Sequence, residues 1–229
     1  TSTHQRHNAV TAIVGRMDIS LAGKVALITG GSRGIGLAIA KSYADSGAQV
    51  MLTSRKEDAL RDAAKFVGGG ASYLAGNAGD TEFAQKCVSA TVEQFGKIDI
   101  FVNNAATNPY AGPTLGVSET QFDKTFQVNL RGPLFWCSQV WDQHMKDNPG
   151  VIINIASVGG IRAEGNLGVY NLTKAALIHL TRQLAGELGL TRVVGIAPGL
   201  VKTDFAQMLV DNYGDSLAKR LPRKRLGEP

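Results

Sequence analysis

Residues 24–44 read KVALITGGSRGIGLAIAKSYA, and this stretch decides the fold. Its first part, residues 24–29, is a short apolar run that ends at glycines, which is typical of a buried parallel strand. Its last part, residues 37–44, has apolar residues at helical spacing. Glycines at positions 30, 34 and 36 permit a tight turn between the two, and the helix that follows offers unpaired N–H groups to an anion. The stretch therefore predicts a strand, a phosphate-binding turn and a helix, with a plain structural turn as the alternative.

The alternation of strands and helices continues along the chain. Short apolar runs predict further strands at residues 49–53, 72–75, 98–102, 151–155 and 192–196. Helical spacing predicts helices at residues 57–66, 81–95 and 119–146, the last with a bend at Gly132-Pro133, and after Tyr170. In the helix after Tyr170, one apolar stripe contains Leu172, Ala176, Leu180, Leu184 and Leu188. We expect one α/β domain with a doubly wound parallel sheet in three αβα layers, the Rossmann fold.

Composition is that of an ordinary globular protein, with 44% hydrophobic and 19% charged residues among 229. No apolar run approaches the about 18 residues of a membrane span, and residues 1–16 lack the apolar region of a signal peptide. We interpret residues 1–16 as an extension and residues 17–229 as the domain. Cys87 and Cys137 form no CxxC or metal-spaced pattern, so we expect reduced thiols, no metal site, no membrane association and a cytoplasmic location.

The net charge of +5 leaves room for anionic ligands. The densest basic cluster lies in residues 219–225, near the end of the chain. No aromatic residues interleave this cluster as they do on single-strand-binding surfaces. We therefore interpret it as a solvated face and expect no nucleic-acid partner.

The end of the second predicted strand indicates which dinucleotide binds. An Asp or Glu there accepts hydrogen bonds from the ribose 2′-hydroxyl of NAD, whereas an Arg accommodates the 2′-phosphate of NADP. Here Ser54 and Arg55 follow the strand without an acid, and Arg33 lies in the glycine turn. Two guanidinium groups and a hydroxyl suit a phosphate dianion, so we predict NADPH/NADP+ as the cofactor. The alternative is that Arg55 and Lys56 only cover a helix surface.

Tyr170 and Lys174 stand four residues apart at the start of a predicted helix. This spacing places both side chains on one helical face. An ammonium close to a phenol favours the phenolate, so we expect Lys174 to lower the pKa of Tyr170 from its ordinary value of about 10. Such a pair suits proton transfer near neutral pH.

With these residues in place, the chain resembles the short-chain dehydrogenase/reductase family, in the subgroup called classical. The matching motifs are Thr29-Gly30, Gly34-Ile35-Gly36, Asn103-Asn104-Ala105, Asn129, Ser157, Tyr170 with Lys174, and Pro198-Gly199. They extend in the family's order from about residue 21 to the last residue. Residues 103–109 and 197–203 are similar to peroxisomal-type carbonyl reductases and to bacterial 3-oxoacyl-[acyl-carrier-protein] reductases.

The resemblance implies a catalytic set of four residues. Tyr170 would protonate the substrate oxygen as hydride leaves the nicotinamide, and Ser157 would hydrogen-bond that oxygen. Lys174 would lower the Tyr170 pKa and bind the nicotinamide ribose, while Asn129 would hold a water that links Lys174 to solvent. A helix-kink hydrogen bond is the structural alternative for Asn129, and a strand-end cap is the alternative for Ser157.

The cofactor-binding residues implied by the resemblance and the glycine turn are Gly30, Ser32, Arg33, Gly34, Ile35, Gly36, Ser54, Arg55, Asn77, Ala78, Asn103, Ala105, Ile155, Tyr170, Lys174, Pro198, Gly199 and Thr203. Among them, Asn103 and Ala105 would line the adenine–ribose side, and Ile155 would lie behind the nicotinamide. Pro198 and Gly199 would support the carboxamide.

Three features depart from the family's pattern. Asn77 stands where an Asp usually contacts adenine, although an amide also forms hydrogen bonds. Residues 187–192 are a couple of residues shorter than usual. Relatives continue past the position of Pro229 into a helix and a seventh strand that carry much of a subunit interface, so we expect this chain to lack both.

We therefore expect an NADPH-dependent ketone reductase for a small carbonyl or acyl-thioester substrate, with 3-oxoacyl thioesters of fatty acid metabolism the first class to test. Phe205, Met208 and Leu209 have helical spacing and either form a lid over an apolar ligand or pack on the domain. One alternative is an NAD(P)-dependent dehydrogenase of secondary alcohols or sugars. Another is an NADP(H)-responsive binding module without catalysis. The resemblance implies a homo-oligomer, a dimer or a homotetramer.

Overall fold

One parallel sheet lies at the centre of the computed structural model, which describes residues 20–229. Its six strands follow the order β3-β2-β1-β4-β5-β6, and every neighbouring pair is parallel. The strands are β1 (Val25–Thr29), β2 (Gln49–Ser54), β3 (Ser72–Ala75), β4 (Ile100–Asn103), β5 (Val151–Ile155) and β6 (Arg192–Ile196). The six predicted strands are confirmed. The predicted extension at residues 1–16 lies outside the described residues.

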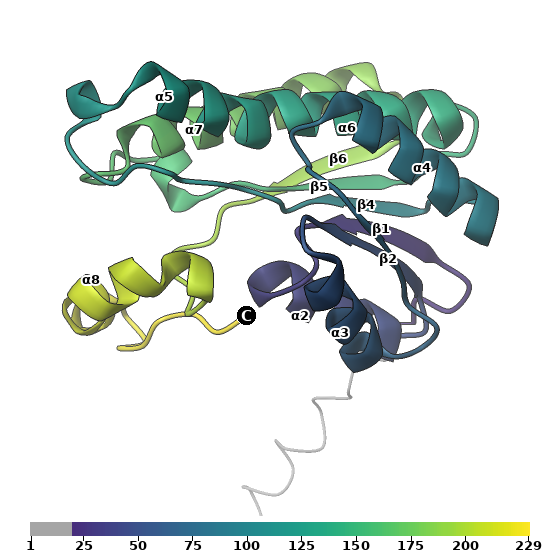
Figure 1. Ribbon diagram of the computed structural model, residues 1–229, viewed down its shortest axis with the longest axis horizontal. Helices are drawn as coiled ribbons and strands as arrows, with labels where there is room; N and C mark the ends of the chain where they lie inside the picture. The colour runs from purple at the N-terminus through teal and green to yellow at the C-terminus, as the bar shows by residue number, and fades with distance from the viewer. Residues whose placement is uncertain (1–19) are drawn as a thin grey trace, which may run out of the picture.

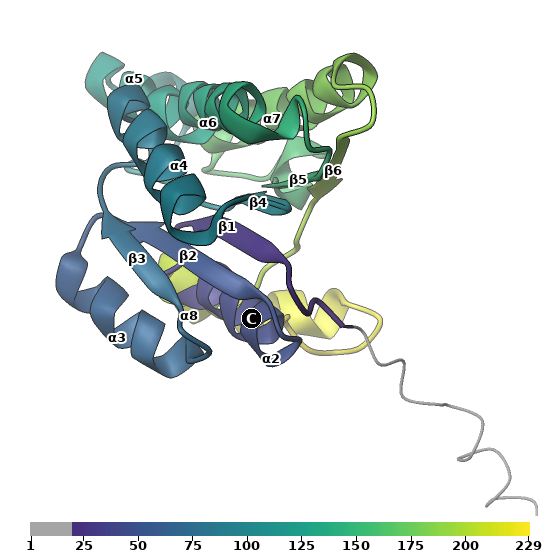
Figure 2. The same ribbon diagram turned by 90° about the vertical axis from the view of Figure 1, so that its right-hand side faces the viewer.

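Helices cover both faces of the sheet, as Figures 1 and 2 show. One layer holds α4 (Thr81–Phe95), α5 (Glu119–Phe126), α6 (Gly132–Val140) and α7 (Gly168–Glu187). The other side holds α2 (Gly34–Asp45), α3 (Glu57–Val67) and α8 (Gln207–Arg220). The predicted doubly wound α/β fold in a single domain is thus confirmed. None of the helices within residues 20–229 is both long and apolar enough to cross a membrane.

Each face of the sheet packs on its own hydrophobic core. One core contains Phe101, Trp136 and Met145, and its two aromatic rings stack with their centroids 5.8 Å apart. The other contains Leu52 and Leu60 and lies on the side of α2 and α3. Because both faces are covered, β1 is buried at every position and reads in the sequence as a continuous apolar run.

The order of the strands reverses between β1 and β4. The chain runs from β1 outward to β2 and β3, returns to β4 and continues to β5 and β6. In open α/β sheets, ligands bind outside the carboxyl ends of the strands at such a reversal. The loops that follow β1, β4, β5 and β6 open on this edge, and they carry most of the predicted site residues.

The helix predicted at residues 119–146 is interrupted more often than the sequence indicates. α5 is followed by a π-helical turn at Gln127–Arg131, and α6 by a second one at Trp141–Met145. A Cβ at Gly132 would lie 2.6 Å from the Ala78 carbonyl oxygen, so glycine allows the helix to approach the turn after β3, and the bend at Gly132-Pro133 stays a prediction. The first π-helical turn contains Asn129, and no feature of the hydrophobic pattern reveals it.

The apolar stripe predicted along α7 is wrong in part. Leu172 is 54% exposed. The buried residues of α7 are Val169, Thr173, Lys174, Leu177, Thr181 and Leu184. Lys174 and Thr181 are buried because they hydrogen-bond to Ile155 and Asn154 of β5. The spacing of apolar residues takes no account of buried polar residues. It therefore predicts a face of α7 that is rotated from the face that is buried.

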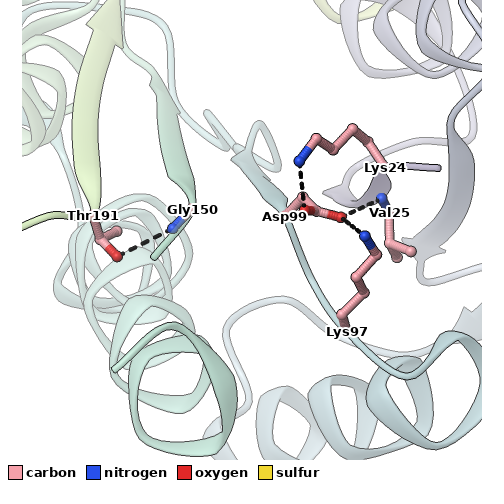
Figure 3. Close-up of polar contacts among 6 residues, drawn as sticks. All are labelled: Lys24, Val25, Lys97, Asp99, Gly150 and Thr191. Carbon is pink, nitrogen blue, oxygen red and sulfur yellow. Dashed lines mark hydrogen bonds and ion pairs between the residues drawn. The ribbon is translucent and has the colours of Figure 1, made fainter. Parts of the chain in front are cut away.

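The short connection between α7 and β6 closes through Gly189 and Thr191. Gly189 has a φ of 59°, which glycine adopts without steric cost. The N–H of Thr191 donates to the Leu188 carbonyl at 3.1 Å. Its buried hydroxyl accepts a hydrogen bond from the Gly150 N–H at 3.3 Å (Figure 3). The turn therefore accommodates a connection that is shorter than in the family, and β6 still pairs with β5 along its length.

Asp99 joins the amino ends of β1 and β4, at the edge opposite the candidate site (Figure 3). Its carboxylate accepts hydrogen bonds from the Val25 N–H at 2.9 Å and from the Lys24 ammonium at 3.0 Å. The Lys97 ammonium lies 3.1 Å away. Burial alone raises the pKa of Asp99, but these donors together outweigh burial and hold the pKa below its usual value.

Replacing Asp99 with alanine should lower the free energy of unfolding at neutral pH by about 1–3 kcal/mol, because three donors lose their acceptor. The folded-state pKa is depressed, so this contribution is complete above the unfolded pKa of about 3.9 and is lost as pH falls through the folded pKa. Urea unfolding of both proteins at neutral and acidic pH measures the difference. Asp58→Ala, which removes an exposed carboxylate next to Arg61, is the matched control. Equal stabilities of Asp99→Ala and the wild type would contradict this role.

Candidate functional site

Four loops and the start of one helix meet at the carboxyl edge of the sheet. The loops follow β1, β4, β5 and β6, and the first two turns of α7 add Tyr170 and Lys174. Lys174 reaches the end of β5, and the ring of Phe205 contacts that of Tyr170 with centroids 6.1 Å apart. Ser157 follows β5 and lies close enough to Tyr170 to lower the pKa of its hydroxyl. The structure thus brings together residues far apart in the sequence.

The glycine turn after β1 has the shape that a dinucleotide phosphate requires. Gly30 and Gly34 have φ values of 67° and 54°, in the region that favours glycine. A Cβ at Gly36 would lie 2.4 Å from the Gly30 carbonyl oxygen, so only a hydrogen fits there. α2 begins at Gly34, and Arg33 before it makes no side-chain cap. The first N–H groups of α2, including that of Ile35, are therefore available to an anion, and the turn fits a pyrophosphate.

Asn104 holds this turn in place, although the sequence analysis assigned it no role. Its side-chain amide donates to the carbonyls of Thr29 at 2.9 Å and Gly30 at 3.1 Å. The Thr29 hydroxyl accepts the N–H groups of Asn104 at 3.0 Å and Ala105 at 3.1 Å. The loop after β4, which includes Ala105, is thus fastened to the glycine turn. In the sequence, the feature that could have indicated this role is the second Asn of the pair at the end of the predicted strand.

The side chain of Asn103 points away from the dinucleotide edge, and the predicted place of Asn103 on the adenine–ribose side stays a prediction. Its amide donates to the Asn154 side chain at 2.9 Å, to the Pro133 carbonyl at 3.3 Å and to the Cys137 sulfur at 3.3 Å. Successive side chains of a strand point to opposite faces. The side chain of Asn103 therefore bonds to β5 and α6, whereas that of Asn104 holds the glycine turn. Only the main chain of Asn103 remains to contact a cofactor.

The residues predicted to bind a 2′-phosphate lie around the start of α2 and the end of β2. The hydroxyl of Ser32 donates to that of Ser54 at 2.9 Å, so the two loops are in contact. Arg55 is exposed and has no ion-pair partner within residues 20–229. Arg33 is exposed too, and its Nη1 lies 3.5 Å from the carboxylate of Asp204. No local pattern in the sequence connects this acid with the glycine turn.

After β3, the predicted adenine-side residues adopt a tight turn. The Asn77 side chain accepts a hydrogen bond from the Gly79 N–H at 3.1 Å. The Ala78 carbonyl accepts one from the indole of Trp136 at 3.0 Å. This turn is thereby fixed to the layer of α6, next to the dinucleotide edge.

Lys174 is buried under the end of β5 and lies beside Tyr170. Its ammonium donates to the Ile155 carbonyl at 2.8 Å and is 5.6 Å from the centroid of the Tyr170 ring. Burial lowers the pKa of Lys174 from its ordinary value of 10.5 to about 8. The ammonium is therefore still the main form at neutral pH, but it loses its proton more easily than an exposed lysine.

The pKa of Tyr170 is raised, whereas the sequence analysis expected it to be lowered. Burial raises the pKa of Tyr170 to about 12, and the negative charge of Glu164 adds to this increase. The hydrogen bond with Ser157 acts in the opposite direction but is outweighed. Loss of solvation of the phenolate thus exceeds the stabilisation by neighbouring groups, and Tyr170 is a protonated phenol at neutral pH.

Ser157 and Pro198 link the loops after β5 and β6. The Ser157 hydroxyl accepts a hydrogen bond from the Gly159 N–H at 3.1 Å. The N–H of Val158 donates to the Pro198 carbonyl at 3.0 Å. Ser157 is therefore both the strand-end cap that was the structural alternative and a neighbour of the Tyr170 hydroxyl.

Asn129 is fully buried in the π-helical turn between α5 and α6. Its side-chain amide accepts the Thr107 N–H at 2.8 Å and donates to the Thr107 carbonyl at 2.8 Å and the Thr173 hydroxyl at 3.2 Å. The side chain thus ties the kinked helix to the loop after β4 and to α7. These contacts match the structural alternative for Asn129, and the water relay stays a prediction.

The segment after β6 runs from Pro198-Gly199 to α8 and lies against the glycine turn. A Cβ at Gly34 would lie 3.1 Å from the methyl carbon of Thr203. The Thr203 hydroxyl accepts a hydrogen bond from the Ala206 N–H at 3.3 Å. Phe205 covers Tyr170 yet is 50% exposed, and Met208 is 56% exposed. Phe205 thus lies beside the site, Met208 is exposed and Leu209 is partly buried, and the lid stays a prediction.

Glu164 should control the ionisation of Tyr170. The Glu164 carbonyl accepts a hydrogen bond from the Asn171 side chain at 2.9 Å, and its carboxylate lies 3.7 Å from Arg162. Glu164→Gln removes the negative charge that helps to raise the pKa of Tyr170, so that pKa should fall. Absorbance of tyrosinate, taken as the difference from Tyr170→Phe in the same background, measures the ionised fraction at alkaline pH. Glu187→Gln, at the other end of α7, is the control, and an unchanged or higher pKa in Glu164→Gln would refute the effect.

Comparison with known sequences identifies similar proteins over most of the chain. The family described as short chain dehydrogenase matches residues 24–214. Human dehydrogenase/reductase SDR family member 4 is 37% identical over 216 residues, which are 91% of this chain and 78% of that protein.

Solved structures share both the fold and part of the sequence. The glucose/ribitol dehydrogenase of the short-chain family from Brucella melitensis superposes with a TM-score of 0.88 at 30% identity, covering 93% of this chain and 87% of that one. The 3-ketoacyl-(acyl-carrier-protein) reductase from the same organism, complexed with NADH, has a TM-score of 0.85 at 33% identity, covering 92% and 87%.

Proposed function

Because the chain belongs to the short-chain dehydrogenase/reductase family, we propose that it is an NADPH-dependent reductase that converts a ketone to an alcohol. The observation that carries the proposal is the meeting of Ser157, Tyr170 and Lys174 beside a glycine turn that fits a pyrophosphate. The first substrate class to test is 3-oxoacyl thioesters, since one similar structure is a 3-ketoacyl reductase. Another similar structure is a glucose/ribitol dehydrogenase, which supports oxidation of sugars or secondary alcohols as the second candidate.

When bound, the reduced nicotinamide supplies the hydride. Tyr170 donates a proton to the substrate oxygen, and its raised pKa supports this direction because the phenol is protonated at neutral pH. The Ser157 hydroxyl hydrogen-bonds the same oxygen and holds the carbonyl within reach of Tyr170. Reduction thus uses the protonated form of the pair, whereas oxidation of an alcohol would require the phenolate.

Lys174 stabilises the charge that remains when Tyr170 gives up its proton. Its ammonium is fixed by the Ile155 carbonyl, and its pKa of about 8 lets it pass on a proton near neutral pH. The proton returns to Tyr170 by way of Lys174, through a water held near Asn129 in the π-helical turn.

The cofactor choice rests on the charges at the end of β2 and in the glycine turn. Ser32, Ser54 and two arginines, Arg33 and Arg55, surround the place of a 2′-phosphate, without an acid at the end of β2. The similar 3-ketoacyl reductase is complexed with NADH, so both cofactors belong in the assay.

A panel of carbonyls and alcohols, each assayed with both cofactors, tests the function. It contains an acetoacetyl thioester, a simple ketone, a sugar and a secondary alcohol. We expect NADPH oxidation with the thioester to have the largest kcat/KM. Faster oxidation of the sugar or the alcohol would favour the dehydrogenase, and tight NADPH binding without turnover on the whole panel would favour a binding module.

The outer face of the helix layer supports self-association. Phe122 of α5, Leu134 and Phe135 of α6 and Leu172 of α7 are each at least 39% exposed. Exposed apolar side chains that gather on neighbouring helices are typical of subunit interfaces. A dimer or tetramer joined through these helices is expected in analytical ultracentrifugation.

A further inference from the structure

One ion pair joins the glycine turn to the segment after β6. Nη1 of Arg33 lies 3.5 Å from Oδ2 of Asp204, and the two residues are 171 positions apart in the sequence. Arg33 immediately precedes α2, and Asp204 is the first residue of a short 3₁₀ turn that leads into α8. The side chains are 62% and 72% exposed, so an anionic ligand can reach both.

The main chain holds Asp204 in this position. A Cβ at the neighbouring Gly34 would lie 3.1 Å from the Thr203 methyl carbon, so the two segments are already in van der Waals contact. The Thr203 hydroxyl caps the turn by accepting the Ala206 N–H. On the other side, the Lys202 N–H donates to the Gly227 carbonyl at 3.0 Å. These contacts fix the backbone around Asp204 and keep its carboxylate next to Arg33.

The carboxylate and a 2′-phosphate require the same guanidinium group. A phosphate dianion near Ser32 and Ser54 gains less from Arg33 while that arginine pairs with Asp204, because the carboxylate neutralises part of the guanidinium charge. The carboxylate also repels a dianion nearby, and this repulsion reaches across several ångströms in water. A neutral ribose 2′-hydroxyl meets neither effect. The pyrophosphate is common to both cofactors, so the difference between NADPH and NADH isolates the effect of Asp204 on the 2′-phosphate.

We propose that Asp204 is a specificity-determining residue that restrains the preference for NADPH over NADH by pairing with Arg33. This inference rests on the proposed NADPH preference. Asp204 is not expected to touch substrate or to take part in proton transfer. It sets how much of the Arg33 charge is available to the 2′-phosphate.

The test measures the Kd of NADPH and of NADH from the fluorescence of the reduced nicotinamide, without any substrate. Asp204→Asn should tighten NADPH binding about three- to tenfold and leave NADH within about twofold. The gain should diminish with added salt, and Asp204→Asn should have a smaller effect in an Arg33→Ala background, where only the direct repulsion of the phosphate remains. Glu228→Gln, which removes an exposed carboxylate paired with Lys202 in the same region, is the matched control and should change neither Kd.

Other outcomes separate the two proposals. If Arg55→Asp abolishes a wild-type preference for NADPH but Asp204→Asn changes nothing, the inference about Asp204 is wrong and the cofactor proposal stands. If the wild type binds both cofactors equally and Arg55→Asp has no effect, the proposed NADPH preference is wrong. Equal tightening of NADPH and NADH in Asp204→Asn would also overturn the inference, since it would indicate a general change of the segment.

Discussion

Tyr170→Phe is expected to lower kcat about 10²- to 10⁴-fold, while the Kd of NADPH changes by no more than about twofold. The variant removes only the hydroxyl that donates the proton. The ring stays, and with it the contact with Phe205 and the packing next to the Lys174 ammonium. An effect confined to kcat therefore isolates the proton donor. Steady-state kinetics on the best substrate of the panel, together with cofactor titration, makes the measurement.

Two controls accompany this variant. Tyr213→Phe removes a hydroxyl from a half-exposed tyrosine of α8 and should retain wild-type kinetics. The thermal midpoint of Tyr170→Phe should lie close to that of the wild type, because the ring and its packing against Phe205 and Lys174 are retained. If Tyr170→Phe keeps more than about a tenth of the wild-type kcat, Tyr170 is not the proton donor.

Lys174→Met should lower kcat about a hundredfold or more without destabilising the fold. Methionine fills a similar volume but lacks the charge that stabilises Tyr170 after proton transfer. Burial of an ammonium is costly, so its replacement by an apolar side chain offsets the loss of the hydrogen bond to the Ile155 carbonyl. A thermal midpoint close to that of the wild type, together with the loss of turnover, would separate catalysis from stability at this position.

The buried ammonium of Lys174 also predicts that the free energy of unfolding depends on pH. Burial lowers the folded-state pKa of Lys174 to about 8, below the ordinary value of 10.5. Between these two values the unfolded chain binds a proton that the folded chain has lost, so Lys174 adds stability as pH rises through this window. Burial raises the pKa of Cys87 and of Cys137 to about 12, which opposes this trend in every variant alike, so the rise is measured as the difference between the wild type and Lys174→Met. Lys174→Met should lack this rise, whereas Lys86→Met, at an exposed position of α4, should keep it. Parallel unfolding curves of Lys174→Met and the wild type across this pH range would contradict the buried charge.

Much of the fold could be predicted because the central strands β1, β2 and β4 are buried on both faces. Such strands read as apolar runs, and each is followed by a helix with its own period, so the strands and most of the helices are predicted close to their observed bounds. The face of α7 was placed wrongly because Lys174 and Thr181 are buried through hydrogen bonds to β5. The π-helical turn at Asn129 was missed because its partners, Thr107 and Thr173, come from other parts of the chain.

By itself, the sequence determined the order of the elements and the glycine turn, and it paired Tyr170 with Lys174, since these depend on local patterns and spacing. Ser157 was selected through the resemblance to the family. Tertiary structure alone decided the pKa of Tyr170, because burial is a property of the packed chain and here it outweighs the neighbouring groups. It also decided that Arg33 meets Asp204, a residue 171 positions away that no local pattern connects to the glycine turn. Features that depend on a single segment can be predicted from the sequence. The pKa of Tyr170 and the pairing of Arg33 with Asp204 depend on segments that come together only in the folded chain.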